Sequence, residues 1–372
     1  MKRLFYVMLG LVISLPIYAQ SNNQLINWFA GADIVGTTGS DDINQTSDFY
    51  VREFELSAFS IIDQTWSGIL TLAYHKEQIT NEEHLEVHEA FLFSSKLFPL
   101  ANVKIGKFFL GFGRLNRFHR HDWIFTEAPL VQKSFFGNEG AKDSGVEYKR
   151  NILALNSTLS IGLTKGDEFN HTHAHDEHEE GEIDRAKSPT AYSRFAKFFE
   201  YSTTRGLEIG LNAINRVDAH GVNYQYAGMD FIYKDRLGKV LTTVVQSEIW
   251  SRNTIEKDND ETHSFQDIGG YLYIEKGLDQ HHAYGVRYDY YKPDDHVEEA
   301  DHEHGIDGLE VDKEFNALAV SYIYTNSEFM RTRVTLEHGV GVVVDSDPDV
   351  DRFTRGQVQF VFSIGAHPSH VY

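Results

Sequence analysis

Along most of the chain, runs of roughly ten residues alternate apolar and polar positions and are separated by turns or loops. One such run places five residues on a single face, with an aromatic residue at each end: Trp66, Gly68, Leu70, Leu72 and Tyr74. Alternation of this length is the sequence signature of a membrane-spanning β-strand, and aromatic residues gather where such a strand meets the two membrane interfaces. The pattern therefore predicts a chain built from strands.

About sixteen strands of this kind can be placed. They are expected at 29–35, 50–60, 66–74, 84–96, 103–109, 146–149, 155–163, 191–200, 206–215, 224–233, 240–250, 265–275, 283–290, 315–324, 329–337 and 357–364. The connections alternate in phase between short, as at 63–64 and 235–238, and mostly longer, as at 166–189 and 293–312. This predicts an all-β fold, a transmembrane antiparallel β-barrel of about 16 strands with long extracellular loops and short periplasmic turns.

Composition agrees with strands, because 26 Phe and 19 Tyr accompany only 7 Pro. The formal net charge of −21 disfavours nucleic acid and anionic lipid as partners and favours cations. The chain has no Cys, so disulfides are excluded.

Residues 1–19 have the pattern of a secretory signal peptide. Lys2 and Arg3 precede an apolar run from Leu4 to Ile17, and Ala19 lies before the expected cleavage at Gln20. Beyond it no run of about 18 apolar residues occurs, so no membrane-spanning helix is expected. We therefore expect export to the bacterial outer membrane and a single barrel over residues 20–372.

The segment 111–145 is the longest connection between two predicted strands and is rich in aromatic and basic residues. Loops of this length are uncommon unless they are functional. We expect it to fold inside the barrel as a constriction loop; an ordinary packed surface loop is the alternative. Arg114, Arg117 and Arg120 are three residues apart, which predicts one face of a short helix.

Charged residues also alternate with apolar ones on the predicted strands. Arg331 and Arg333 oppose Met330 and Val334. An Arg or Lys facing lipid at the membrane centre would cost roughly 2–4 kcal/mol, so these side chains should face a wet lumen. The residues predicted to line the pore constriction are Arg114, Arg117, Arg120, Glu53, Glu55, Glu208, Arg331 and Arg333.

Two long loops combine histidine with acids. The loop 166–189 carries His171, His173, His175 and His178, and the loop 293–312 carries His296, His302 and His304. Imidazole and carboxylate are ligands for zinc and related ions, so these histidines are candidate metal ligands. His119 and His121 in the segment 111–145 are a further candidate pair. The alternative is a solvated acidic loop in which histidine is incidental. No cofactor is required, and any zinc or other divalent ion should bind weakly because a flexible loop must be ordered.

The strand order and loop pattern resemble bacterial general porins, in which the loop after the fifth strand folds inward. Three segments are also similar to short, plug-less barrels labelled zinc-regulated TonB-dependent outer-membrane receptors: 106–109, 113–123 and 365–370. A TonB-dependent transporter carries a plug domain, for which the residues between Gln20 and the first strand leave no room. The resemblance therefore implies a passive channel and not an energised transporter.

We predict a porin-like channel for passive diffusion of small solutes, including divalent metal ions such as zinc. A metal-capturing surface barrel without transport is one alternative, and an outer-membrane barrel enzyme is another. No nucleophile motif or phosphate-binding loop is found, so we expect no enzyme and assign no catalytic residue. Expected partners are outer-membrane lipid and lipopolysaccharide, small solutes or metal ions, and no nucleic acid; a homotrimer is compatible with the porin resemblance.

Overall fold

The structure is a computed structural model that describes residues 26–39, 48–76, 83–169, 186–237, 240–258, 261–294, 309–310, 314–341, 343–344 and 352–365. The predicted signal peptide lies outside these residues. None of the described helices is long and apolar enough to cross a membrane.

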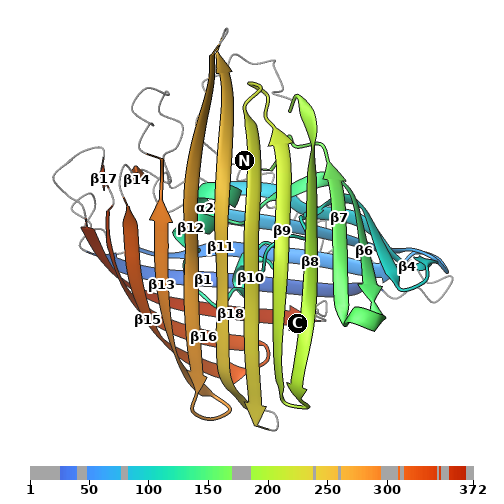
Figure 1. The fold of residues 1–372 in the computed structure, drawn as a ribbon. Helices are drawn as coiled ribbons and strands as arrows, with labels where there is room; N and C mark the ends of the chain where they lie inside the picture. Colours follow the sequence, from blue (N-terminus) through green and yellow to red (C-terminus); the bar gives the residue numbers. More distant parts are fainter. Residues whose placement is uncertain are drawn as a thin grey trace, which may run out of the picture.

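Sixteen strands form one closed antiparallel barrel, in which β18 pairs with β1 (Figure 1). The strands are β1 (Asn27–Gly39), β2 (Asp48–Ile61), β3 (Ser67–Lys76), β4 (Glu83–Phe98), β5 (Ala101–Phe109), β6 (Lys142–Ile152), β7 (Ser157–Thr164), β8 (Ser188–Ser202), β9 (Arg205–Val217), β10 (Asn223–Leu237), β11 (Val240–Asp258), β12 (Glu261–Gly277), β13 (His282–Lys292), β15 (Phe315–Ser327), β16 (Met330–Val340) and β18 (Arg352–Gly365). Two short strands, β14 (Leu309–Glu310) and β17 (Val343–Val344), pair with each other outside the barrel. The predicted fold class and strand number are confirmed.

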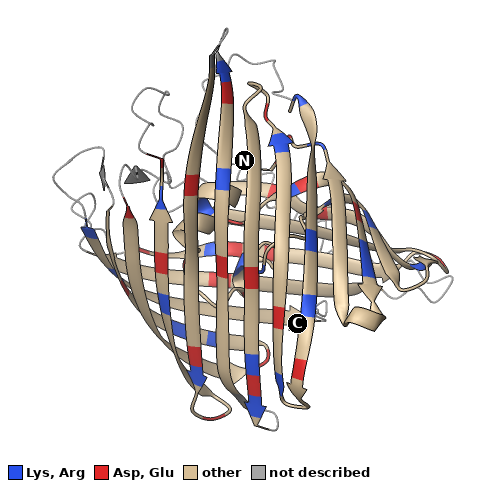
Figure 2. Cartoon of the chain, viewed as in Figure 1, with Lys and Arg blue, Asp and Glu red and all other residues tan. Residues whose placement is uncertain are grey.

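The barrel wall sorts side chains by the period of two that a strand imposes. In β13, Val286 and Tyr288 point outward and are 43% and 46% exposed, whereas Arg287 and Asp289 point inward and are 4% and 2% exposed. The outer face carries a belt of large apolar side chains that includes Leu70, Leu85, Ile161, Leu211, Ile249, Leu318 and Leu336. Figure 2 shows charged positions recurring along the same strands between uncharged ones. An apolar outside and a charged inside are what a barrel in lipid requires.

Residues 110–141, the inner loop, connect β5 to β6 and lie inside the barrel. The loop contains the 3-10 turn η1 (Arg120–Asp122) and the helix α2 (Leu130–Phe136), which is seen within the barrel in Figure 1. The constriction loop was predicted to run to residue 145, but residues 142–145 belong to β6 because they pair with β5 from Phe109↔Lys142 to Gly106↔Gly145. A second 3-10 turn, η2 (Leu153–Leu155), follows β6.

The inner loop is closed at its neck by one side chain. Asn116 donates to the carbonyls of Leu110 and Ala141, both at 2.9 Å, and accepts from the Ala141 amide at 2.6 Å. This holds the first and last loop residues together, so the loop enters the lumen as one folded unit.

The principal hydrophobic core lies where the inner loop meets the wall. Phe112, Phe135 and Phe136 are at most 1% exposed, and they pack against wall aromatics. The Phe136 ring lies 4.9 Å from Trp250 and 5.6 Å from Tyr226, measured between centroids. The loop aromatics therefore anchor the loop by burying apolar area inside the lumen.

Candidate functional site

The inner loop spans the lumen from one wall to the opposite one. On one side the Gly113 amide donates to Asn212 of β9 at 2.9 Å, and the Leu115 amide donates to Glu248 of β11 at 2.8 Å. On the other side Arg52 of β2 donates to the Thr126 carbonyl at 2.7 Å. In the closed strand order, β2 lies opposite β10, between β9 and β11. The loop therefore occupies the middle of the barrel.

Gly113 is required for this crossing. Its φ is +59°, and a Cβ placed there would lie 2.6 Å from the Glu248 carboxylate. A larger residue at this position would be strained and would push the loop away from β11.

The three loop arginines do not share a helix face, so the prediction of a short helix carrying them is wrong. Residues 113–119 form turns, because their backbone and side-chain hydrogen bonds go to the wall and to the loop neck. Arg114 lies over the Phe118 ring at 5.0 Å, and Arg117 lies 3.6 Å from Glu208. Arg120 instead lies 3.4 Å from Glu127 within the loop.

The other predicted constriction residues fall into three places. Arg331 of β16 donates to the His121 carbonyl at 2.9 Å, and Arg333 donates to Gln359 at 2.7 Å. Glu208 of β9 pairs with Arg194 at 2.8 Å. Glu53 and Glu55 of β2 face two loop histidines and belong to a separate cluster.

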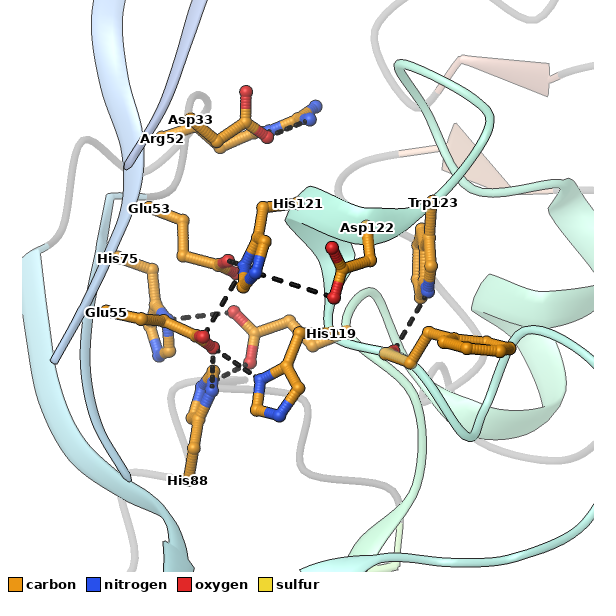
Figure 3. Close-up of polar contacts among 12 residues, drawn as sticks. Asp33, Arg52, Glu53, Glu55, His75, His88, His119, His121, Asp122 and Trp123 are labelled. Atoms are coloured by element: carbon orange, nitrogen blue, oxygen red, sulfur yellow. Dashed lines mark hydrogen bonds and ion pairs between the residues drawn. The ribbon is translucent and has the colours of Figure 1, made fainter. Parts of the chain in front are cut away.

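Nine residues form a continuous histidine–glutamate row between the loop and the β2–β4 wall. They are Glu53, Glu55, His75, Glu86, His88, Glu89, His119, His121 and Glu139. Figure 3 shows the labelled members converging from wall and loop. Three overlapping groups within the row each bring their donor atoms within 4.8 Å of one another: His75, Glu86, His88 and Glu139; Glu55, His88 and His119; and Glu53, Glu55 and His121.

Individual contacts in the row are short. His75 Nε2 lies 3.0 Å from Glu86, and His88 Nε2 lies 3.1 Å from Glu139. Glu55 joins the groups, because its Oε1 lies 2.9 Å from His88 Nδ1 and 2.7 Å from His119 Nδ1. At the end of the row, His121 Nδ1 lies 3.2 Å from Glu53. The row therefore links the two predicted loop histidines to wall residues.

Two β-bulges place extra polar side chains at this wall. In β4 the register with β3 shifts between Thr71 and Leu72, so His88 has no partner in β3, and both His88 and Glu89 turn inward. In β2 a shift against β1 does the same for Arg52 and Glu53. A bulge adds one residue to a strand and re-aims the side chains beside it.

The sequence-based candidates did not include His75, Glu86, His88, Glu89 or Glu139. A signal for part of this set was present, since His84, Glu86 and His88 alternate with Leu85 and Val87 and so share the inward face of β4. Glu139 offered no such signal, because it comes from the far end of the inner loop.

The negative charge of the carboxylates in the row is balanced by protonated histidines and by the ammonium of Lys142. Burial alone would lower the pKa of His121, but the carboxylates of Asp122 and Glu55 outweigh burial and raise it to about 9. The pKa of His119 is likewise raised, against the effect of burial, by Glu55 and Glu89. Burial would raise the pKa of Glu139, yet Lys142 and His75 hold it well below its usual range. The lowered pKa of Glu139 and the raised pKa of His119 and His121 have the same cause, the close approach of opposite charges in the row.

The seven histidines of the loops 166–189 and 293–312 lie outside the described residues. Their role as metal ligands stays a prediction.

Comparisons with known proteins bear on the fold. No family model matches the chain. An uncharacterized protein of Aquifex aeolicus is 32% identical over 106 residues, which cover 28% of this chain and 21% of that protein. The chain thus matches about a fifth of the length of that relative.

Solved structures that are similar in fold include three outer-membrane proteins. The anion-selective porin from Comamonas acidovorans has a TM-score of 0.61 at 10% identity, covering 92% of this chain and all of the porin. The outer-membrane channel DcaP of Acinetobacter baumannii has a TM-score of 0.60 at 11% identity over 92% of this chain and 97% of its own. OmpT, an outer-membrane protein of Vibrio cholerae in a trimer form, has a TM-score of 0.59 at 7% identity over 92% of this chain and all of its own.

These comparisons give no support to the resemblance with zinc-regulated TonB-dependent receptors. At such low identity the likeness concerns the fold. The chain has the closed barrel fold of bacterial outer-membrane porins.

Proposed function

We propose that this protein is an outer-membrane channel for passive diffusion of small hydrophilic solutes, divalent metal ions such as zinc among them. The observation that carries the proposal is a closed sixteen-stranded barrel with a charged inner face and an inner loop held across its lumen. A barrel of this strand number is wide enough for an aqueous channel, and an inward loop sets its narrowest part. Similarity to porins and channels supports the same function.

Divalent cations are proposed as solutes because of the histidine–glutamate row. Its carboxylates lie between the inner loop and the barrel wall, and low-dielectric walls concentrate the field that attracts cations. Imidazole next to carboxylate favours transition-metal ions over calcium or magnesium, which prefer oxygen alone.

Purified protein in planar bilayers tests the channel. We expect discrete, ohmic conductance steps in potassium chloride and a measurable zinc current in a zinc chloride gradient. Protein that inserts and is folded, yet gives no steps in either salt, would contradict the channel function.

One observation favours a second candidate, a metal-capturing barrel without transport. The inner loop packs tightly on opposite walls, and its aromatic residues Phe112, Phe135 and Phe136 are fully buried. If the loop closes the lumen, the protein should bind zinc in solution but show no conductance in the same bilayers.

The outer belt of apolar side chains is proposed to contact outer-membrane lipid and lipopolysaccharide.

A homotrimer is also proposed, since the trimer form of OmpT shares this fold. Cross-linking in native membranes would show a species of three chains.

The loop arginines are expected to set ion selectivity. Changing Arg114, Arg117 and Arg120 to Gln removes three positive charges from the lumen, where they are at least partly shielded from bulk water. We expect the cation-to-anion permeability ratio to rise by about twofold or more, because focused fields act strongly on passing ions. The reversal potential in a potassium chloride gradient measures this change.

Arg205 is the matched control, since its side chain is 57% exposed at a turn between strands. Arg205→Gln should leave the reversal potential as in the wild type. An unchanged potential in the folded triple variant would show that these arginines only pin the loop.

A further inference from the structure

We propose that His75, Glu86, His88 and Glu139 form a built binding site for one divalent transition-metal ion, of the zinc class, on the lumen wall. This inference deepens the proposed function by naming where a metal ion is held, and only its physiological meaning rests on that function. The site ties the end of the inner loop, through Glu139, to strands β3 and β4.

The geometry fits one ion. The four residues each offer one donor atom, and these atoms lie within 4.8 Å of one another. Ligands roughly 2.0–2.2 Å from a single zinc ion span at most about 4.4 Å, so small side-chain rotations are enough to close the set. Two imidazoles and two carboxylates are a donor set that suits zinc, cobalt, nickel and copper(II).

The surroundings also match a metal site. His88 uses Nδ1 to contact Glu55 at 2.9 Å, which leaves Nε2 directed at Glu139. A histidine ligand usually has a carboxylate on its other nitrogen, which orients the ring and raises its basicity. His75 and His88 are stacked with ring centroids 5.1 Å apart, so both rings are held in place by packing.

An ion can reach the site. His75 and His88 side chains are only 5% and 1% exposed, but Glu86 and Glu139 each keep 17% of their side chains exposed. The more exposed carboxylates would therefore meet an arriving ion first, and the imidazoles would complete its coordination.

A proton-balanced network is the competing explanation for the same four residues. Lys142 pairs with Glu86 and, at 3.0 Å, with Glu139, so its ammonium already supplies positive charge at the site. The two explanations differ in what Lys142 does. In a metal site it competes with the ion for the same carboxylates, and its removal should tighten metal binding.

The test is titration of the purified, full-length barrel in detergent with zinc chloride, followed by calorimetry, and with cobalt chloride, followed by visible absorption. All proteins, including the reference, carry Asn at the seven loop histidines 171, 173, 175, 178, 296, 302 and 304, which removes that background. We expect the reference to bind at least one zinc ion and to give cobalt bands of low-symmetry nitrogen–oxygen coordination. His75→Asn with His88→Asn should weaken zinc binding at least tenfold and abolish those bands.

Lys142→Gln leaves all four ligands in place and should tighten zinc binding several-fold. His281→Asn with His282→Asn removes two histidines at the start of β13, away from the four ligands, and should leave zinc binding as in the reference. Folding of every variant is checked by heat-modifiable migration on gels. If the His75 and His88 variant fails to fold, the Lys142→Gln result decides.

The proposed metal site is contradicted if the reference binds no zinc or if the His75 and His88 variant binds zinc as tightly as the reference does. It is also contradicted if Lys142→Gln leaves the affinity for zinc unchanged or lowers it. Conductance is not used in this test. Zinc binding without any conductance would therefore contradict the proposed channel function but support the metal site. Conductance without zinc binding would support the channel function and contradict the metal site.

Discussion

Replacing residues 111–140 by an Asn-Gly turn is expected to raise single-channel conductance several-fold. The two strands that flank the inner loop are paired as far as Phe109↔Lys142, and the Leu110 amide donates to the Ala141 carbonyl at 3.1 Å. Leu110 and Ala141 are therefore adjacent, and a two-residue turn can join them without disturbing the hairpin. The loop crosses the lumen between β2 and β9–β11. Its removal should therefore widen the cross-section that is open to solutes.

The shortened barrel should be less stable than the wild type, because wall arginines and aromatics lose buried loop partners. Trp250 and Arg252, for example, lose Phe136 and the Ser134 carbonyl. Conductance is therefore compared only for protein that migrates as folded. The control carries Asn-Gly at Thr203 and Thr204, in the exposed turn between β8 and β9. Equal conductance of the shortened and control barrels would mean that the inner loop does not limit the solute path.

Changing Arg52 to Met is expected to destabilise the barrel by about 3–5 kcal/mol. The Arg52 side chain is almost fully buried and lies between two carboxylates: its Nε is 3.0 Å from Asp33, and its Nη1 is 2.8 Å from Glu127. It also donates to the Thr126 carbonyl of the inner loop. Methionine keeps much of the volume but takes this partner from both carboxylates. Glu127 keeps Arg120 and Lys133, whereas Asp33 keeps the uncharged Gln359 amide, and a buried charge without a cation beside it is costly.

Urea unfolding in detergent or vesicles measures this loss. Adding Asp33→Asn to Arg52→Met should recover part of the stability, since the buried charge at position 33 is removed. Arg205→Met is the control, because the Arg205 side chain of the Arg205–Asp235 ion pair is 57% exposed and the pair should contribute no more than about 1 kcal/mol. If Arg52→Met and Arg205→Met lose the same free energy of unfolding, Arg52 does not hold the loop to the wall.

The fold could be predicted closely from the chain alone. Each strand carries its own period of two, as at Leu70 and Leu72 on the outer face, and lipid outside with water inside imposes that period on every strand. The count of about sixteen strands followed from this local pattern and from loop lengths, whereas the inward course of the loop after the fifth strand followed from the length and aromatic residues of 111–145 and from the resemblance to porins. Glu53 and Glu55 were predicted to face inward for the same reason, and both are buried there.

The candidate site was predicted only in part, because it depends on residues that meet from distant points of the chain. His119 and His121 were named from the sequence, but the spacing of the loop arginines suggested a helix that the tertiary hydrogen bonds of Gly113 and Leu115 replace. Isolated spacing cannot reveal bonds to strands a hundred residues away.

The barrel of about sixteen strands and its charged interior could be predicted from the chain because each strand carries its alternation locally, and the inward loop from the length and aromatic content of 111–145 together with the resemblance to porins. Two features became visible only in the folded barrel: bulges turn Arg52 and His88 into the lumen, and Glu139 returns from the end of the loop to meet His75 and His88. A bulge is fixed by pairing between strands, and the convergence of loop and wall is fixed by packing across the lumen. Neither interaction is local in the chain, so no pattern within a single segment could contain it.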